Sequence, residues 1–351
     1  MIITVTLNAA IDNTLSVPHF RLGARHRAVD KRAAAGGKGI NVARALKCLG
    51  QPVIATGFAG GVTGTRIIEY LTGESVLNDF VRIGEESRTS TVLIDPTTGE
   101  QTEINEHGPR VTESELELFR EKLMYLAPGA DICVIAGSVP RGIDQELYAE
   151  LVTALRKAGV LTLVDAEGDV MSQALRAEPD MIAPNQNEAE EIVGREFGDG
   201  DDLSTAPAEL RSLGARDAVV TTSDGCWATL ADDPDVTLHV RAPELDPITT
   251  VGSGDALVAG LVSARYIGLS GDEALRYAVA CGAESTQHFG AGTLNRAAVD
   301  QLVDRVEIDV TVDLGVFDDR LRFGPEPEVR PLNGVEERLL PQSIARDQEL
   351  S

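Results

Sequence analysis

Short apolar runs rich in β-branched residues alternate along this chain with longer segments in which apolar residues recur every three or four positions. The first pattern predicts strands and the second predicts helices. We expect strands at residues 2–7, 53–56, 132–136, 161–165, 181–183 and 218–222. We expect helices at residues 40–49, 113–126, 144–158, 187–193, 206–213, 256–266 and 271–288.

This alternation predicts an α/β fold. Strands that are apolar along nearly their whole length are typical of a parallel sheet that helices bury on both faces, which gives three layers around a mostly parallel central sheet. In sheets of this kind, ligands bind beyond the carboxyl ends of the strands. We therefore expect the functional residues in the turns that follow strands.

Two patches interrupt the alternation. Residues 14–17 with 26–33, and 89–94 with 101–105, have the pattern of short antiparallel strands, and the turn Asp95-Pro96-Thr97-Thr98-Gly99 joins the second pair. Inserted at about residues 14–35 and 87–107, these strands would form a small antiparallel β lid. A lid of this kind can keep water out of a reaction site.

The strand and helix patterns extend over residues 1–312, which we expect to form one domain with the lid inserted. Beyond residue 312 the periodicity decays, and four prolines occur among mixed charges. This composition is typical of an extended or partly disordered tail over residues 313–351.

The composition is that of an ordinary globular protein, with 43% hydrophobic and 25% charged residues among 351. No apolar stretch reaches the roughly 18 residues that span a bilayer, and the first residues read as a strand, not a secretion signal. The four cysteines are far apart and form no CxxC pair, so we expect reduced thiols and a cytoplasmic protein without a membrane partner. The five histidines form no metal-binding pair.

The net charge of −25 argues against nucleic acid as a partner. Residues 1–50 differ from the rest, because they carry eight basic and only two acidic side chains. A basic segment in an acidic protein indicates that a small anion is collected there. The alternative is a solvated face that balances acidic neighbours.

Two glycine-bracketed turns are candidates for anion binding: Gly36-Gly37-Lys38-Gly39-Ile40-Asn41 and Thr250-Val251-Gly252-Ser253-Gly254-Asp255. An apolar run that predicts a buried helix follows the second turn. Backbone N–H groups and the helix dipole at such a helix start favour phosphate oxygens, and glycine lets the anion approach closely. Asp255 could then accept a proton from an attacking hydroxyl; alternatively, it only caps the helix.

Two common nucleotide-binding fingerprints are absent from the sequence. The turn Gly36-Gly37-Lys38-Gly39 is followed by isoleucine, so it is no Walker A motif, and no GxGxxG follows the first strand. A Rossmann-type dinucleotide oxidoreductase is therefore a weak alternative.

Four stretches together carry a resemblance to a known family. They are Asn8-Ala9-Ala10-Ile11-Asp12, Gly36-Gly37-Lys38-Gly39-Ile40-Asn41-Val42-Ala43, Pro184-Asn185-Gln186-Asn187-Glu188 and Thr250-Val251-Gly252-Ser253-Gly254-Asp255. In this order and spacing, the chain closely resembles the ribokinase-like sugar kinases of the phosphofructokinase B type over roughly residues 1–312. Within that family it is most similar to the 1-phosphofructokinase and tagatose-6-phosphate kinase branch.

The resemblance implies a Mg²⁺- and ATP-dependent transfer of a γ-phosphoryl group to a sugar hydroxyl on a ribokinase-like fold. It implies that Asp255 is the catalytic base and that the amides of Gly252, Ser253 and Gly254 hold the developing charge. Asn185 and Glu188 match an Asn-x-x-Glu motif that organises Mg²⁺ and its waters. The same spacing fits a helix capping box, and both interpretations can hold together.

The resemblance also implies a site for a phosphorylated sugar. It assigns sugar hydroxyls to Asp12, Gly37, Asn41 and Ser138, for which turn or surface positions are the alternative. For the phosphate that the sugar already carries, the candidates are Arg88, Lys38 and Arg27. Surface solvation is the alternative for all three cations, although a guanidinium can bind phosphate through two hydrogen bonds.

For the nucleotide, the resemblance implies contacts from Asn185, Thr221, Ser223, Gly225, Gly252, Gly254, Gly282 and Ser285. The chain departs from the family here: Ser223-Asp224-Gly225 is one residue short of a Gly-x-x-Gly form, Ala9 stands where proline is usual, and the loop 60–64 lacks an aspartate. These departures affect the adenosine contacts and leave the phosphoryl-transfer residues intact.

We therefore expect a kinase of a ketohexose phosphate. Fructose 1-phosphate, phosphorylated at O6, and tagatose 6-phosphate, phosphorylated at O1, are the main candidates, followed by fructose 6-phosphate. The alternatives are a kinase of an unphosphorylated sugar or nucleoside, and a sugar-phosphate-binding regulator that lost catalysis on the same fold. The family suggests a homodimer joined through the lid strands, which is compatible with a small sheet whose edges need covering.

Overall fold

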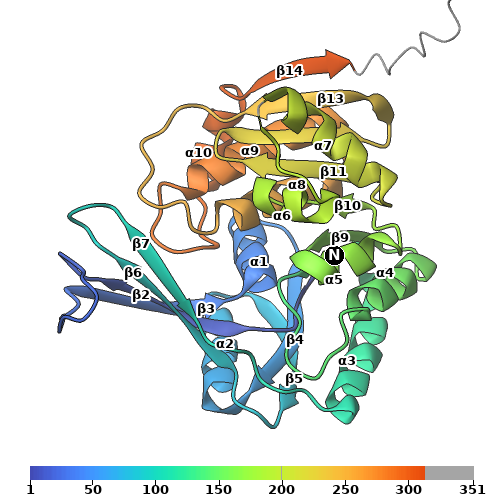
Figure 1. Cartoon of the computed structure of the whole chain (residues 1–351). Coiled ribbons are helices and arrows are strands. Elements are labelled where there is room, and N and C mark those ends of the chain that lie inside the picture. Colours follow the sequence, from blue (N-terminus) through green and yellow to red (C-terminus); the bar gives the residue numbers. More distant parts are fainter. Residues whose placement is uncertain (199, 313–351) are drawn as a thin grey trace, which may run out of the picture. The chain divides into compact units, whose positions relative to one another are not determined.

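The computed structural model describes residues 1–198 and 200–312, which belong to one compact unit (Figure 1). The tail expected over residues 313–351 lies outside the described residues. Among the residues that the structure describes, no helix is both long and apolar enough to cross a membrane.

A ten-stranded sheet forms the middle layer of the described unit. From β5 to β11 neighbouring strands run parallel, and β12, β13 and β14 continue the sheet with antiparallel pairings. In spatial order the strands are β14 (Glu307–Val312), β13 (Asp233–Arg241), β12 (Gly225–Leu230), β11 (Asp217–Thr222), β10 (Met181–Ile182), β9 (Leu161–Asp165), β8 (Ile132–Ala136), β1 (Ile2–Thr6), β4 (Val53–Gly60) and β5 (Leu77–Ile83).

Helices cover both faces of this sheet, so the expected three-layer α/β/α architecture with a mostly parallel sheet is confirmed. One face packs against α1 (Lys38–Cys48), α2 (Gly61–Gly73), α8 (Ser253–Tyr266), α9 (Gly271–Ser285) and α10 (Arg296–Val303). The other packs against α3 (Glu113–Leu126), α4 (Leu147–Lys157), α5 (Gly168–Leu175), α6 (Gln186–Val193) and α7 (Gly200–Ser212), and the short turn Ala127–Gly129 extends α3.

The sequence of each central strand supplies both cores, because successive side chains of a strand point to opposite faces. In β8, Ile132 and Val134 belong to the core beside α1 and α8, whereas Cys133 and Ile135 belong to the core beside α3 and α4. The resulting strands are apolar on both faces, as the sequence pattern predicted.

Helix α8 is buried around most of its circumference, with residues 255–264 all buried. A helix that is apolar on all sides lies inside a protein. Gly260 lets α8 approach α9 closely, since a Cβ at this position would lie 2.8 Å from the Ala278 Cα atom and 2.9 Å from the Cys281 sulfur. This close packing fixes the position of the α8 N-terminus.

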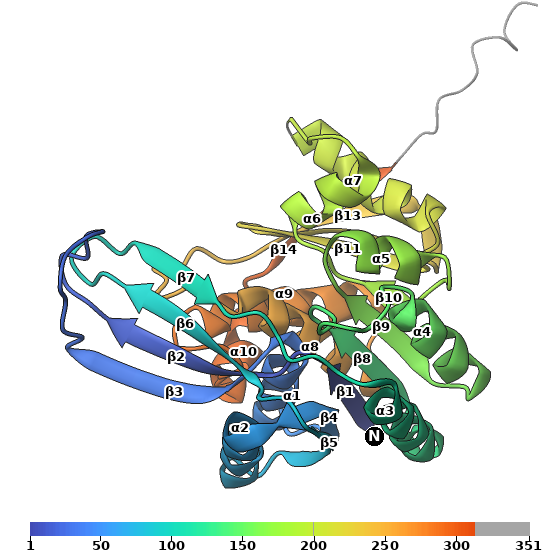
Figure 2. The ribbon, with the colours of Figure 1, turned by 60° about the horizontal axis from the view of Figure 1, so that its bottom comes forward.

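The second sheet is the lid, and its spatial order is β3 (Asp30–Gly36), β2 (Ala10–Ser16), β6 (Arg88–Ile94) and β7 (Gln101–Asn105). Figure 2 shows it extending away from the central sheet. The outer pairs are antiparallel, as expected, and the central pair β2–β6 is parallel. Strand β2 begins earlier than expected and β3 begins and ends later, because Ala10–Ser16 pairs residue by residue with Asp30–Gly36.

Candidate active site

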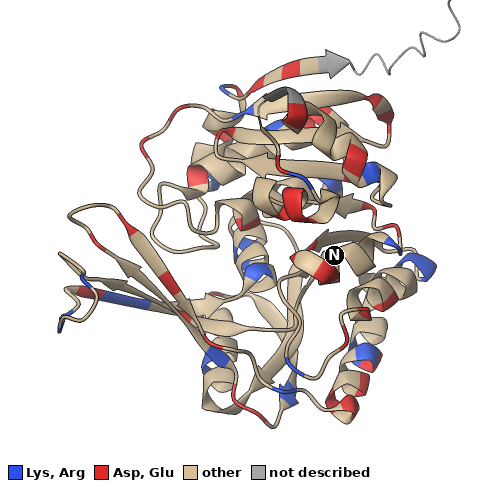
Figure 3. Cartoon of the chain, in the orientation of Figure 1, with Lys and Arg blue, Asp and Glu red and all other residues tan. Residues whose placement is uncertain are grey.

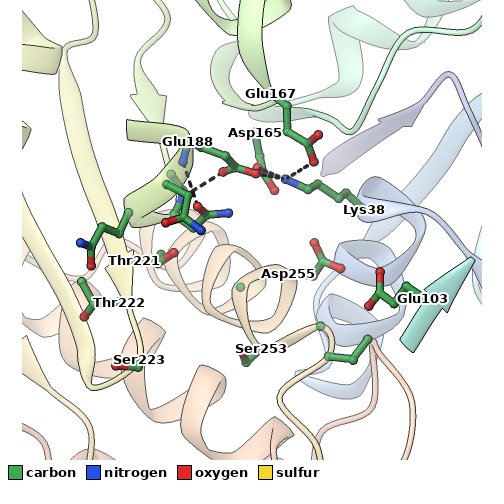
Figure 4. A pocket seen from close by; sticks show the side chains of 17 residues that line it. Lys38, Glu103, Asp165, Glu167, Glu188, Thr221, Thr222, Ser223, Ser253 and Asp255 are labelled. Carbon is green, nitrogen blue, oxygen red and sulfur yellow. Dashed lines mark hydrogen bonds and ion pairs between the residues drawn. The ribbon is translucent and has the colours of Figure 1, made fainter. Parts of the chain in front are cut away.

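A cleft of about 650 Å³ lies at the carboxyl ends of β9, β10 and β11, the edge at which parallel sheets bind ligands. The start of α1, the N-terminus of α8 and lid strand β7 complete its walls (Figure 4). The polar residues of its lining include Lys38, Glu103, Asp165, Glu167, Asn185, Glu188, Thr221, Thr222, Ser223, Ser253 and Asp255.

The N-terminus of α8 opens into this cleft. Gly252 precedes the helix in a left-handed conformation (φ 83°), and no side chain of the described residues caps the first turn. A Cβ on Gly252 would lie 2.4 Å from the Ala291 Cβ atom, so only glycine fits here. The helix therefore presents backbone amides that no side chain caps, with the positive end of its dipole, to the cleft, although the Ser253 amide donates to the Thr250 carbonyl oxygen at 3.2 Å.

The carboxylate of Asp255 lies in the first turn of α8 and faces the cleft. The Asn41 Nδ2 atom donates a 2.8 Å hydrogen bond to Asp255 Oδ2. Burial, helped by the Asp165 carboxylate, raises the pKa of Asp255 to about 7, although the Asn41 hydrogen bond opposes this shift. A carboxylate with such a pKa can accept a proton near neutral pH.

The second polar atom of the Asn41 side chain is unsatisfied. Asn41 Oδ1 is buried and has no hydrogen-bond partner among the described residues. A buried polar atom without a partner is rare in native structures and needs an explanation. A ligand hydroxyl donating to Asn41 Oδ1 would supply the missing hydrogen bond.

Asp12 and Arg88 come from neighbouring lid strands, where Asp12 pairs with Ser90 and Ala10 pairs with Arg88. Burial raises the pKa of Asp12 to about 6 against the opposing charges of Arg88 and Arg44. The Arg88 Nε atom donates to the carbonyl oxygen of Asn8 at 3.2 Å, and no ion pair within 4 Å engages its guanidinium in the part of the chain that the structure describes.

Lys38 lies within a cluster of carboxylates. Its Nζ atom is 3.0 Å from both Asp165 Oδ1 and Glu188 Oε1, and 3.8 Å from Glu167 Oε1 (Figure 4). Burial alone would lower the pKa of Lys38, but Asp165 and Glu188 raise it above its ordinary value. Lys38 was predicted as a cation for the substrate phosphate; in this structure its charge is already paired within the cleft.

Asp165 and Glu167 were not predicted as site residues from the sequence. Asp165 is buried at the carboxyl end of β9, and Glu167 follows two residues later. A carboxylate at the end of an apolar parallel strand is a signal that could have identified Asp165, because ligands bind at that edge.

Asn185 and Glu188 form the capping box that was the alternative to a metal role. Asn185 Oδ1 accepts from the Glu188 amide and Glu188 Oε2 accepts from the Asn185 amide, each at 2.9 Å. Glu188 still directs Oε1 to Lys38, so one carboxylate serves both the helix start and the cleft. Among residues 1–198 and 200–312, no three His, Cys, Asp or Glu side chains form a ready metal-binding group.

An adjoining hollow of about 410 Å³ contains most of the residues predicted for the nucleotide. Its lining includes Thr221, Ser223, Gly225, Ser253, Gly254 and Gly282. Ser285 is buried behind this wall, where its Oγ atom donates to the Gly282 carbonyl oxygen at 2.7 Å. The hollow continues into the cleft, since both share Thr221, Ser223, Ser253 and Gly254.

Three further residues were predicted to bind the substrate: Gly37, Ser138 and Arg27. Gly37 precedes α1 at φ 106°, and Ser138 Oγ accepts from Asn8 Nδ2 at 3.0 Å. Arg27 is exposed in the loop between β2 and β3 and is not part of the cleft lining. Asp12, Gly37, Asn41, Arg88 and Ser138 are likewise not among the residues that line this cleft, and the role of Arg27 as a phosphate-binding cation stays a prediction.

The basic segment 1–50 is partly balanced by acidic neighbours. Figure 3 shows basic positions on β3 and α1. In addition to Lys38, Arg44 contacts Glu74, with 2.6 Å between Arg44 Nε and Glu74 Oε2, and Arg32 contacts Asp30. Arg44 also donates to the carbonyl oxygen of Ala291 at 2.6 Å, which holds the loop that packs against Gly252.

Comparisons with known proteins agree with this geometry. The sequence model of the pfkB family of carbohydrate kinases matches residues 5–298. A 1-phosphofructokinase of Borreliella burgdorferi is 32% identical over 80% of this chain and 90% of its own length, and a tagatose-6-phosphate kinase of Staphylococcus epidermidis is 30% identical over 88% and 99%. The crystal structure of phosphofructokinase-2 from Escherichia coli with substrates and products superposes with a TM-score of 0.81 at 29% identity, covering 87% of this chain and 98% of that one.

Proposed function

The chain belongs to the pfkB family of carbohydrate kinases, and from this premise we propose that it transfers the γ-phosphoryl group of ATP to a hydroxyl of a ketohexose phosphate. The observation that carries the proposal is the position of Asp255, whose carboxylate lies beside the uncapped amides of α8 and faces the cleft. An acceptor hydroxyl and a phosphoryl group need these two features side by side.

In this mechanism Asp255 takes the proton of the acceptor hydroxyl as the oxygen attacks phosphorus. Asn41 donates to the Asp255 carboxylate and holds it toward the acceptor. The amides of Gly252, Ser253 and Gly254 stabilise the charge that develops on the migrating group. Phosphoryl transfer needs little covalent help, so positioning and fixed dipoles supply most of the catalysis.

We propose that the acceptor is a sugar phosphate whose existing phosphate is bound by Arg88. This guanidinium is half-buried, has no ion pair within 4 Å among the described residues, and stands on the same lid face as Asp12. The names of the relatives support fructose 1-phosphate or tagatose 6-phosphate, with fructose 6-phosphate, which a solved relative binds, behind them. Gly37, Asn41 and Ser138 are proposed to contact the sugar, and Lys38 is proposed to contact a phosphate when the cleft is filled.

ATP is the co-substrate, and we propose that it occupies the hollow beside Thr221 and Gly282. Mg²⁺ is proposed to bind near Asn185 and Glu188 through its waters, with Asp165 as a further oxygen donor. The donor groups suit a cation, because the Asp165 and Glu188 carboxylates already hold the Lys38 ammonium group between them, at 3.0 Å each. Carboxylate oxygens suit this hard ion, which would neutralise charge on the phosphates.

A homodimer joined through the lid strands is also proposed. The lid has free edges at β3 and β7, and Ile104 on β7 is 56% exposed. Edges and exposed apolar side chains of this kind favour pairing with a second copy. The cytoplasmic location stays a prediction from the sequence.

The proposal is tested by coupled ADP-release assays on a panel of sugar phosphates and their unphosphorylated parents. We expect turnover of a ketohexose phosphate and little turnover of the free sugar. Activity on free sugars or nucleosides alone would overturn the role of Arg88. A regulator without catalysis would instead show sugar-phosphate binding but no ATP binding in calorimetry.

A further inference from the structure

Lid strand β7 places a carboxylate in the cleft that the proposed mechanism does not use. Glu103 pairs with Val92 of β6 and lines the cleft together with Lys38 and Asp255. Figure 4 shows its side chain entering from the lid, on the side of Asp255. No hydrogen bond or ion pair engages the Glu103 carboxylate among the residues that the structure describes.

The contacts of β7 fix which of its sides faces the cleft. Side chains alternate along a strand, so Gln101, Glu103 and Asn105 share one face. The Gln101 Nε2 atom donates to Thr249 Oγ1 at 3.3 Å, next to the turn that precedes α8, and Asn105 Oδ1 accepts from Ser90 Oγ. Both neighbours on this face are therefore engaged, and Glu103 between them is left facing the ligand space.

An unpaired carboxylate in a site for anions restricts what can bind beside it. Glu103 is one of the charges that raise the pKa of Asp12, so it acts on the same region as Asp12. A phosphate placed next to Glu103, which has no cation paired with it among the described residues, would be repelled. Sugar hydroxyls, in contrast, can donate hydrogen bonds to a carboxylate, which only accepts when ionised.

The lid also separates Glu103 from the cation proposed for the phosphate. Arg88 stands four residues before Val92, the partner of Glu103, which is about 13 Å along the strand at about 3.3 Å per residue. One face of the lid therefore presents a cation at one end and a carboxylate at the other. This arrangement suits a ligand with a phosphate at one end and hydroxyls at the other.

We propose that Glu103 is a specificity-determining residue that accepts hydrogen bonds from hydroxyls of the acceptor sugar and orients its phosphate toward Arg88. The inference rests on the proposed function and extends it to the lid. Because Gln101 on the same strand contacts Thr249, a sugar held by Glu103 would add a second link between the lid and the α8 side of the cleft.

The test uses Glu103→Gln, which keeps the size of the side chain and removes its charge. A hydrogen bond to a charged group contributes about 1.5–3 kcal/mol, and glutamine retains part of it. We therefore expect the KM and the calorimetric Kd of the sugar phosphate to rise about tenfold, which corresponds to about 1.4 kcal/mol, with the KM of ATP unchanged. Thermal unfolding should match that of the wild type, since Glu103 is exposed.

Deoxy analogues distinguish direct recognition from a structural effect. Removing the hydroxyl that Glu103 binds should weaken binding to the wild type more than binding to Glu103→Gln, which retains only part of the hydrogen bond, whereas other deoxy analogues should weaken both equally. The matched control is Glu100→Gln, the same exchange on the same hairpin outside the cleft lining, which should change neither constant.

Two outcomes would contradict the inference in different ways. Wild-type turnover of a sugar phosphate with an unchanged KM and Kd in Glu103→Gln overturns the role of Glu103 alone. A wild type that turns over no sugar phosphate overturns the proposed function, and this inference falls with it.

Discussion

Replacing Asn41 by leucine is expected to move the pH dependence of the reaction to higher pH. Leucine has the branched shape and the number of side-chain heavy atoms of asparagine but is larger, so it removes the donor to Asp255 Oδ2 without opening space for water. The Asn41 hydrogen bond stabilises the ionised form of Asp255 and therefore holds its pKa down, against the larger effect of burial. Without that hydrogen bond, a higher pH is needed to ionise the base.

The size of the shift follows from the 2.8 Å contact. A hydrogen bond to a charged group contributes about 1.5–3 kcal/mol, and one pKa unit corresponds to about 1.36 kcal/mol. The pKa of Asp255, about 7 in the intact protein, should therefore rise by about one to two units in the variant. At pH 7 the ionised fraction would fall from about one half to between about 1% and 10%, which lowers kcat/KM about 5- to 50-fold.

The assay is the pH profile of kcat/KM for the best sugar phosphate, measured by ADP release between pH 5.5 and 10. The deficit of Asn41→Leu at pH 7 should shrink as the pH rises, and what remains at high pH measures the lost contact with the sugar. Ser138→Ala is the control, because it touches the predicted sugar site but not Asp255; it should lower kcat/KM without moving the midpoint. An unchanged midpoint in Asn41→Leu would refute the role given to this hydrogen bond.

Three further predictions concern the same cleft. Asp255→Asn should lower kcat by several orders of magnitude yet raise the midpoint of thermal unfolding at pH 8. The pKa of Asp255 in the folded protein, about 7, lies above the ordinary 3.8, so the wild type loses stability as the pH rises between these two values. Near-normal turnover, or a lower midpoint at pH 8, would contradict this prediction. Lys38→Met should bind Mn²⁺ more tightly in calorimetry without nucleotide, because Asp165 and Glu188 lose their shared cation, while kcat falls; weaker Mn²⁺ binding would oppose this reasoning. Arg88→Gln should raise the KM of the sugar phosphate at least tenfold and leave the KM of ATP unchanged, as ADP-release kinetics can measure, and an equal rise in both would point to a general defect.

The parts of the fold that follow from local pattern were predictable. The central parallel strands are apolar on both faces, which gives continuous apolar runs in the sequence. The turn before α8 needs a glycine in the left-handed conformation and is followed by a long apolar helix, so it too can be recognised from the sequence. The antiparallel strands β12, β13 and β14 were not predicted. Strand β13 is only partly buried and contains polar residues that interrupt the apolar run, and β12, although buried, is short and begins with glycine. Strand β10 is only two residues long, and its pairing with β9 and β11 defines it.

For the candidate site, single residues were predictable from the sequence, but the contacts between them were not. Asn41 and Asp255 were predicted as separate residues, but their hydrogen bond joins positions 214 residues apart and follows only from the packing of α1 against α8. The ion pairs of Lys38 depend on the ends of β9 and the start of α6 meeting beside α1. No site role was predicted for Glu103, because its place in the cleft depends on which face of β7 turns inward, and strand pairing determines that face.

The contact between Gly252 and Ala291 limits how this scaffold can be redesigned. With the two β-carbon positions only 2.4 Å apart, any side chain at 252 would collide with a methyl group whose own backbone is held by Arg44. Mutant libraries intended to change the acceptor should therefore leave 252 and 291 untouched. Residues should instead be varied at the inward positions of β7, where a new side chain would enter the cleft without colliding with the protein.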